Sequence, residues 1–583
     1  MKQEVPGITM MNKSKFFPEY ALYSLAFLAA LGIRLASLGQ SFLTNPEAGW
    51  ALQALHLAQG THPEIGAQPA LVLLTGSLFF LFGSSEVIAR LAPAVVGSLL
   101  VFSPLLFRNR LGKLAAIILA FALAFDPGLV AMSRQVDGHI LALAFTVFGL
   151  GFLNDRKPAG FGIFLGLAFL VGTPVWLGWA ALLLAGLIFL VLRPKHPKTA
   201  GILGVETVLE PPEYFGILKK SLIWLAGTVF FAGTLFFMEP KALSGAGTGL
   251  VIFFTGYSGA NEVPFFQILA GLFFYEPFPL ILAVFASIRS LINKKRADQF
   301  LALAWLISLI LVSAYPGRQV GDLIWVDVPM WALTASLLAQ VFGSKLPKKL
   351  EFSEAVLTIV LLVSAWLNFI AAMSSQFADA TGHWVLIVFM AFFLGAAVIL
   401  LTWGWSWKIA MRGVGLGFCS LLVFFTLSAA FKAAGQGPRP EQELWLTGPD
   451  FKEADLLVKT AGDYSLWNTN NPTALDLTVV NGSPALQWLF RNFTKTDFED
   501  NLPADAAPSM VVTPEQVTLS LPGQYTGQSF VTELAPTWSK LTASDWIKWM
   551  IFRQAPLEKT TVVLWVKSDL FPGSIDFNLK RTP

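Results

Sequence analysis

The chain has 583 residues, of which 55% are hydrophobic and only 13% are charged, against roughly 25% charged residues in soluble domains. Its mean hydropathy is +0.62, so the composition excludes a soluble globular protein. The net charge of +3 is too small to indicate a nucleic-acid partner, and the single Cys excludes a disulfide framework. Long runs of Leu, Ala, Val and Phe predict an all-α polytopic protein of the cytoplasmic membrane, in contact with membrane lipids.

The apolar runs and the basic clusters between them predict the topology. The first run follows a polar, Lys-containing segment and has no small-residue cleavage pattern, so we interpret it as a span. Short cytoplasmic loops collect Lys and Arg, and this rule predicts about 13 transmembrane helices with the N-terminus inside and the C-terminus outside. The expected spans are 17–38, 88–107, 114–128, 138–153, 160–173, 175–192, 221–238, 265–288, 299–315, 320–342, 354–372, 383–403 and 413–432.

The first external loop, about 39–87, is expected to contain interfacial helices. The run 69–82 has about 14 residues, short of the roughly 17 to 25 that a spanning helix needs, so we expect it to be interfacial or re-entrant. Before it, Asn45 suits the N-cap of a helix, Pro46 its first position and Gly60 its end. This helix should also lie on the interface, because its apolar residues form one stripe.

Beyond residue 432 the composition changes to scattered charges and short β-type runs, after a Gly- and Pro-rich linker. We therefore divide the chain into a membrane domain, 1–432, and an external α/β domain, 433–583. The segment around Trp488 is helix-like, and it either recognises an acceptor glycan or packs the domain. Neither a Gly-rich phosphate loop nor a Walker-type Lys is present, which again indicates no nucleotide partner.

Ionisable residues avoid the expected spans and gather at their outer ends. A transporter is expected to bury polar groups near the middle of the bilayer, so this pattern favours a site at the outer membrane surface. Glu47 is the first candidate, as a general base at the entrance of a lipid-exposed cavity. The alternative is that Glu47 only complements the N-terminus of its helix.

Three segments of the sequence resemble a known group. The loop from Thr44 to Gly60, the segment from Leu81 to Pro93, and Ser133 to Asp137 are similar to the start of the polyprenyl-phosphate-sugar-dependent membrane glycosyltransferases. That superfamily has the C-type fold and includes the protein O-mannosyltransferases and the lipid A aminoarabinose transferase. The resemblance covers roughly residues 17–340, and it implies a polyprenyl-phosphate sugar donor and a glycan, lipid or protein acceptor.

One departure from the family pattern concerns the first loop. The family usually opens this helix with Asp-Glu, whose Asp is the catalytic carboxylate, whereas this chain has Pro46-Glu47. Either Glu47 has become the base, or the chain binds a lipid-linked glycan without transferring the sugar and acts in binding or envelope assembly. A solute or lipid transporter is the third alternative.

The remaining site candidates lie in the first external loop and in later external segments. Asp137 assists the base, holds a metal, or pairs with Arg134 one helical turn before it. Arg318 is the phosphate candidate, since the resemblance implies a basic residue there and a guanidinium binds phosphate through two parallel hydrogen bonds. The further substrate-binding candidates are Arg134, Asp322, Glu64 and His62.

No metal ligand set stands out by spacing, and some family members need a divalent metal while others do not, so the sequence leaves a metal open. The resulting hypothesis is an inverting membrane glycosyltransferase that moves a sugar from a polyprenyl phosphate to an acceptor at the outer face. A carboxylate would serve as its general base.

Overall fold

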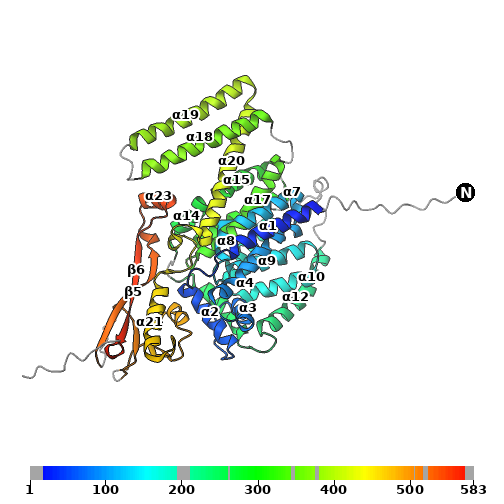
Figure 1. Cartoon of the computed structure of the whole chain (residues 1–583). Helices are drawn as coiled ribbons and strands as arrows, with labels where there is room; N and C mark the ends of the chain where they lie inside the picture. Colours follow the sequence, from blue (N-terminus) through cyan, green and yellow to red (C-terminus); the bar gives the residue numbers. More distant parts are fainter. Residues whose placement is uncertain are drawn as a thin grey trace, which may run out of the picture.

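The computed structural model describes residues 17–192, 211–259, 263–293, 295–342, 348–374, 380–503, 506–516 and 523–571. Figure 1 shows a body of helices with a strand-bearing domain at one end and the start of α1 at the opposite end. The polar N-terminal segment before α1 lies outside the described residues.

The helical body follows the chain almost continuously from α1 to α20. Several consecutive helices are joined by a single residue, such as Gly112, Gly172 or Glu276. The helices are α1 Phe17–Leu35, α2 Asn45–Ala58, α3 Pro69–Phe82, α4 Glu86–Leu99, α5 Ser103–Leu106, α6 Arg108–Leu111, α7 Lys113–Phe125, α8 Pro127–Met132, α9 His139–Asn154, α10 Pro158–Val171, α11 Thr173–Val191, α12 Pro211–Gly233, α13 Ala242–Thr255, α14 Phe265–Tyr275, α15 Pro277–Asn293, α16 Arg296–Ala314, α17 Ile324–Phe342, α18 Lys349–Met373, α19 Ala380–Gly404 and α20 Trp407–Phe431.

Eight helices in the described part of the chain are long and apolar enough to cross a membrane, or nine if the bent pair α14 and α15 counts as one span. A multi-pass helical protein is thus confirmed, while the count of 13 spans and the orientation stay predictions. Several expected spans correspond to shorter apolar helices, among them α7, α9 and α10. Helices α18 and α19 lie side by side at one edge of the body (Figure 1), and their apolar windows are only 6% and 0% buried, as suits lipid-facing helices.

The two helices expected in the first external loop are present. Helix α3 has the bounds expected from its apolar run, 69–82. Helix α2 begins one residue earlier than predicted: Thr44, rather than Asn45, is its N-cap, so Pro46 occupies the second position of the helix. Thr44 is the N-cap because Glu47 then stands at the third helical position and forms a capping box with it.

The C-terminal domain contains one six-stranded mixed sheet in the order β1-β5-β6-β4-β2-β3. Strand β2 pairs in parallel with β3 and β4, and the other pairs are antiparallel. The β-type runs and the helix-like segment around Trp488 correspond to a sheet and to helix α22, so the α/β character is confirmed, while the boundary at residue 432 stays a prediction. The elements are β1 Asp450–Phe451, α21 Ala454–Thr469, β2 Leu477–Val480, α22 Pro484–Leu489, β3 Thr496–Glu499, β4 Met510–Pro514, β5 Tyr525–Pro536, α23 Ala543–Phe552 and β6 Leu557–Lys567.

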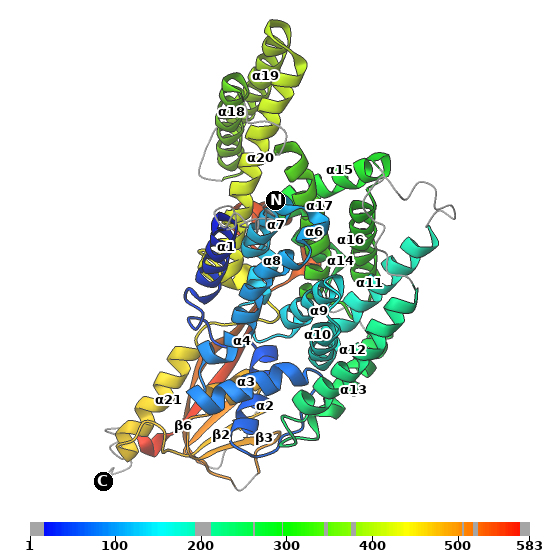
Figure 2. The ribbon, with the colours of Figure 1, turned by 90° about the vertical axis from the view of Figure 1, so that its right-hand side faces the viewer.

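The C-terminal domain packs directly on the first loop, and Figure 2 shows α2 and α3 beside its strands. Trp488 of α22 is buried, stacks on Phe79 of α3 with 5.8 Å between ring centroids, and donates a hydrogen bond to Glu86 at 2.9 Å. Arg491 lies over the Trp488 ring and pairs with the same carboxylate. Of the two interpretations of this segment, the structure therefore supports packing.

Candidate functional site

Glu47 lies in a buried ion pair at the start of α2. Its carboxylate meets the guanidinium of Arg90 on α4 through two parallel bonds, Nε to Oε1 and Nη2 to Oε2, each 2.8 Å. Both side chains are almost fully buried, at 1% and 4% exposed. Arg90 also donates to the carbonyl oxygens of residues 38, 41 and 42 and to the Ser41 hydroxyl, so its charge fixes the end of α1 and the turn into α2.

The remaining acceptor capacity of Glu47 is also used. Oε2 accepts from the Thr44 amide at 3.0 Å and from the Thr44 hydroxyl at 3.2 Å, and Oε1 accepts from the amide of Val136 at 2.9 Å. Burial alone would raise the pKa of Glu47, but the charge of Arg90 and these hydrogen bonds hold the pKa below its ordinary value. Glu47 therefore joins α2, α4 and the peptide that precedes Asp137.

Asp137 belongs to a second buried group, in which His139 lies between two carboxylates. His139 Nδ1 is 2.7 Å from Asp137 Oδ2, and its Nε2 is 3.4 Å from Asp322 Oδ1. Asp322 also accepts from the amide of Gln319 at 2.8 Å. Both ring nitrogens face acceptors, which favours an imidazolium that carries a proton on each nitrogen.

Asp137 keeps one weakly engaged oxygen. Gln68 donates to Oδ1 at 3.4 Å, a long contact, and its carbonyl oxygen accepts from the amide of Gly138 at 2.9 Å. Burial would raise the pKa of Asp137, yet the charge and hydrogen bond of His139 lower it. The side chain of Asp137 is 9% exposed, whereas that of Glu47 is 1% exposed. Of these two buried carboxylates, Asp137 is therefore the more exposed and the less fully hydrogen-bonded.

Two glycines allow these close approaches. A Cβ on Gly321 would lie 2.7 Å from the His139 ring, and one on Gly138 would lie 2.7 Å from Gln68 Oε1. Neither glycine needs an unusual backbone conformation, so the requirement is one of space. Any larger residue at Gly321 would have to displace the imidazole, which is itself buried.

The two arginines predicted to bind substrate are held by backbone carbonyls. Arg134 donates to the carbonyl oxygens of Ile33, Arg34, Ala36 and Ser37, at and just beyond the end of α1, and burial lowers its pKa to about 10. It does not form the predicted pair with Asp137, whose partner is His139. Arg318 donates from Nε to Val263 at 2.9 Å and from Nη1 to the carbonyls of residues 313 and 315, while its Nη2 makes no hydrogen bond within the described residues.

The other predicted residues divide between two places. Asp322 joins the group around His139 and lies four residues after Arg318. His62 lies apart from it: it is 65% exposed and contacts the buried Glu239, with 2.7 Å between Nδ1 and Oε2. Glu64 is exposed in the same part of the first loop. The structure thus brings together Glu47, Asp137 and Asp322, and places His62 and Glu64 at the surface beside the α12–α13 connection.

The sequence did not single out three residues that complete the site: Arg90, His139 and Gln68. Arg90 and Glu47 are 43 residues apart, so no local pattern joins them. His139 stands two residues after Asp137, and this short Asp-Gly-His spacing was the available signal. Gln68, directly before α3, carries no charge, and no sequence signal pointed to it.

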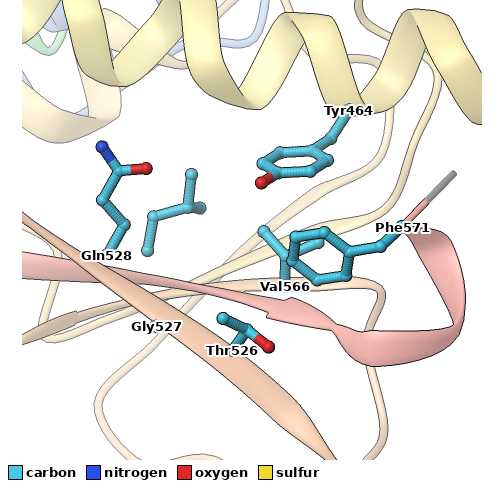
Figure 3. A pocket seen from close by; sticks show the side chains of 7 residues that line it. Tyr464, Thr526, Gly527, Gln528, Val566 and Phe571 are labelled. Atoms are coloured by element: carbon cyan, nitrogen blue, oxygen red, sulfur yellow. The ribbon is translucent and has the colours of Figure 1, made fainter. Parts of the chain in front are cut away.

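Two cavities in the described part of the chain lie away from this cluster. One, of about 270 Å³, opens between α21 and strands β5 and β6 of the C-terminal domain, where Tyr464, Phe571 and Gln528 line it (Figure 3). Another, of about 540 Å³, is apolar and lies among α11, α15 and α16. Neither contains a residue of the Glu47 or Asp137 groups.

Comparison with solved structures identifies the fold. ArnT from Cupriavidus metallidurans bound to undecaprenyl phosphate superposes with a TM-score of 0.52 at 14% identity, over 95% of this chain and 98% of ArnT. The chain has the ArnT fold. The apo form of the same ArnT aligns with a TM-score of 0.49 at 15% identity, over 94% of this chain and 98% of that one. The ArnT fold confirms, at the level of architecture, the resemblance that the first-loop motifs indicated.

A third solved structure aligns less well, and two sequence comparisons found no match. The Archaeoglobus fulgidus oligosaccharyltransferase in complex with Zn and sulfate aligns with a TM-score of 0.39 at 14% identity, over 85% of this chain and 68% of that one. No protein-family model matches the chain, and no curated protein matches it. The similarity to ArnT thus lies in the fold, because few residues are shared.

Proposed function

We propose that the chain is a multi-pass glycosyltransferase of the cytoplasmic membrane, which moves a sugar from a polyprenyl-phosphate donor to an acceptor at the outer face. Three observations support the proposal: the apolar helices, the ArnT fold, and a buried group of ionisable residues beside the C-terminal domain. ArnT was solved with undecaprenyl phosphate, which makes a polyprenyl-phosphate-linked sugar the donor to test first. The acceptor is a glycan, a lipid or a protein.

The observation that carries the mechanism is that Asp137 is less fully bonded than Glu47. Among the described residues, the side-chain donor to its Oδ1 is Gln68 at the long distance of 3.4 Å, so this oxygen can accept the proton of an acceptor hydroxyl as the hydroxyl oxygen attacks the anomeric carbon. The new bond forms between the acceptor oxygen and the anomeric carbon, while the bond from that carbon to the phosphate oxygen breaks. A single displacement of this kind inverts the sugar. His139 holds Asp137 in place and limits its rotation.

Glu47 is better suited to positioning than to proton transfer. As a base it would have to leave Arg90 and strand a buried guanidinium, which is costly. Its bond to the Val136 amide fixes the peptide directly before Asp137. In this mechanism Glu47 and Arg90 hold the site in a fixed geometry. The base is Asp137, the second carboxylate that the sequence indicated.

The donor phosphate needs a cation that is still available for hydrogen bonding. Arg318 retains Nη2, and it lies one residue before Gln319, whose amide is bound to Asp322. A phosphate on Nη2 would therefore lie on the segment that carries Asp322. His62 and Glu64, on the exposed part of the first loop, are left for the sugar or the acceptor.

A second candidate function is that of a lipid-linked glycan binding or envelope assembly protein. It is favoured by one observation: the carboxylate in the first loop is closed off by Arg90, whereas the family pattern places its catalytic carboxylate there. Such a protein would bind a polyprenyl-phosphate sugar and release it unchanged.

The two candidates differ in one assay. Purified full-length protein is incubated with a panel of polyprenyl-phosphate sugars and a total envelope extract, and released polyprenyl phosphate is measured. The transferase releases it only when acceptor is present, and Asp137→Asn reduces the rate by about 10²- to 10⁴-fold, the usual contribution of a general base. Asp155→Asn, a matched change at a partly exposed carboxylate after α9, keeps the rate. Binding of a donor without any release in the presence of acceptor would favour the second candidate.

A further inference from the structure

Three carboxylates that the proposed mechanism does not use meet in the interior of the protein. Asp126 caps the start of α8, Glu276 separates α14 from α15, and Asp327 lies in the first turn of α17. All three side chains are 0% exposed. Carboxylate oxygens of the three, one from each, lie within 4.8 Å of one another. Segments about 150 and 50 residues apart in the sequence thus place three like charges together.

Most of the oxygens in this acidic cluster lack a donor. Asp126 accepts from the amide of Leu129 at 2.6 Å and from the Trp331 indole at 2.7 Å. Both oxygens of Glu276 and both oxygens of Asp327 have no hydrogen-bond partner in the described part of the chain. No Lys or Arg among those residues forms an ion pair with any of the three.

The nearest buried cation is already used elsewhere. Arg34 donates to the Ser133 hydroxyl and to the carbonyl oxygens of residues 30, 123 and 124. Three buried carboxylates without an ion-pair partner in the described residues, two of them also without a hydrogen-bond donor, cannot all stay ionised, because the cost of burying even one unpaired charge is several kcal/mol. The cluster must therefore hold a bound cation or share protons.

The geometry points to a cation, and we propose that Asp126, Glu276 and Asp327 bind a divalent metal ion, with Ca²⁺ as the best fit. Only oxygen ligands are present, which selects a hard cation. Ligands on opposite sides of Ca²⁺ lie about 5 Å apart, since each bond is roughly 2.3 to 2.6 Å. A shared proton joins two carboxyl groups at a time, whereas one ion contacts all three groups.

Tightly packed residues surround the three carboxylates. A Cβ on Gly128 would lie 2.8 Å from Asp327 Oδ2 and 2.7 Å from the Trp445 ring, so only Gly fits there. Trp445, in the segment that leads into the C-terminal domain, is 1% exposed. The ion would join the starts of α8, α15 and α17 beneath that segment. Its role is structural and does not depend on the transferase activity, although α8 leads to Asp137 and α17 follows Asp322.

Direct metal measurements test the proposal on the full-length protein in detergent. We expect the purified wild type to carry about one Ca²⁺ per chain by elemental analysis, and chelation to lower its thermal unfolding midpoint until Ca²⁺ is restored. Tb³⁺, which replaces Ca²⁺, should show luminescence sensitised by the adjacent Trp331, and Ca²⁺ should compete it away. Wild type without bound metal, and with no response to added Ca²⁺ or Tb³⁺, would overturn the proposal in favour of shared protons.

Substitutions of the proposed ligands test where the ion binds. Asp327→Asn and Glu276→Gln should each abolish the Tb³⁺ signal. Glu354→Gln is the matched control, because this carboxylate is buried on α18 outside the cluster, and it should keep the signal. Asp137→Asn should keep it as well, which separates this site from the proposed catalytic group. Loss of the signal in Asp137→Asn, or its persistence in a folded Asp327→Asn, would contradict the assignment.

Discussion

Neutralising Glu47 should destabilise the protein strongly, whatever its catalytic role. Glu47→Gln keeps the shape of the side chain but removes the charge that balances the buried Arg90. Breaking a buried pair costs about 3 to 5 kcal/mol. Arg90 retains four other acceptors, three carbonyl oxygens and a hydroxyl, so we expect the lower end, about 3 kcal/mol.

The assay is thermal unfolding of the detergent-solubilised protein, followed by Trp fluorescence at one scan rate. Glu64→Gln, an exposed carboxylate on the same loop, is the control and should leave the midpoint unchanged. The double variant Glu47→Gln/Arg90→Met should lower the midpoint by less than the sum of the single changes, because no unpaired charge then stays buried. Equal midpoints for Glu47→Gln and Glu64→Gln would refute the buried pair.

The difference in unfolding midpoint between wild type and Glu47→Gln should depend on pH in a way that follows from the lowered pKa of Glu47. The pKa of Glu47 in the folded protein lies below its ordinary value of 4.5, so the contribution of the ion pair is complete above that pH. It is lost only as the pH falls through the lowered value. The difference in midpoint between wild type and Glu47→Gln should therefore stay constant between about pH 5.5 and pH 8. A difference that shrinks within this window would show that the carboxylate titrates there.

Two further substitutions test the packing around the site. Gly321→Ala should reduce sugar transfer without preventing folding, because its Cβ would displace the His139 ring. The control is Gly415→Ala on α20, which has open space around it and should keep the full rate. Equal rates for the two variants would contradict the role of Gly321 in positioning His139. Trp488→Ala should lower the unfolding midpoint, since removing a buried Trp costs about 3 to 5 kcal/mol. Trp467→Ala, at a side chain 60% exposed, should not; a similar loss in both would mean that the domain contact is not specific.

The sequence predicted the local features of the fold well. The bounds of α3 follow from an apolar run between Pro69 and Gly83, and α2 from its Pro and its capping residues. Strand β5, Tyr525–Pro536, was not predicted, because its first half is polar and contains four consecutive exposed residues, 526–529, and the strand is held by its pairing with β6. Long-range pairing of this kind leaves little trace in one strand alone.

The candidate site was predicted in its residues but not in its contacts. Glu47, Asp137 and Asp322 were all identified, since carboxylates at the ends of apolar runs are unusual. The partner Arg90 could not be assigned, because its bond to Glu47 joins α4 to α2, 43 residues apart. His139 was missed although it stands only two residues after Asp137. The contacts also change the expected roles: the fully bonded Glu47 suits positioning, and the more open Asp137 suits proton transfer.

The most direct test of this account is a single-turnover measurement of sugar transfer from a polyprenyl-phosphate donor by wild type, Asp137→Asn and Glu47→Gln, each corrected for its folded fraction and donor binding. We expect transfer by wild type, a loss of about 10²-fold or more in Asp137→Asn with donor binding retained, and a smaller loss in Glu47→Gln. Full transfer by Asp137→Asn together with complete loss in folded Glu47→Gln would contradict the assignment and make Glu47 the base. Binding without transfer in wild type would contradict the enzyme itself.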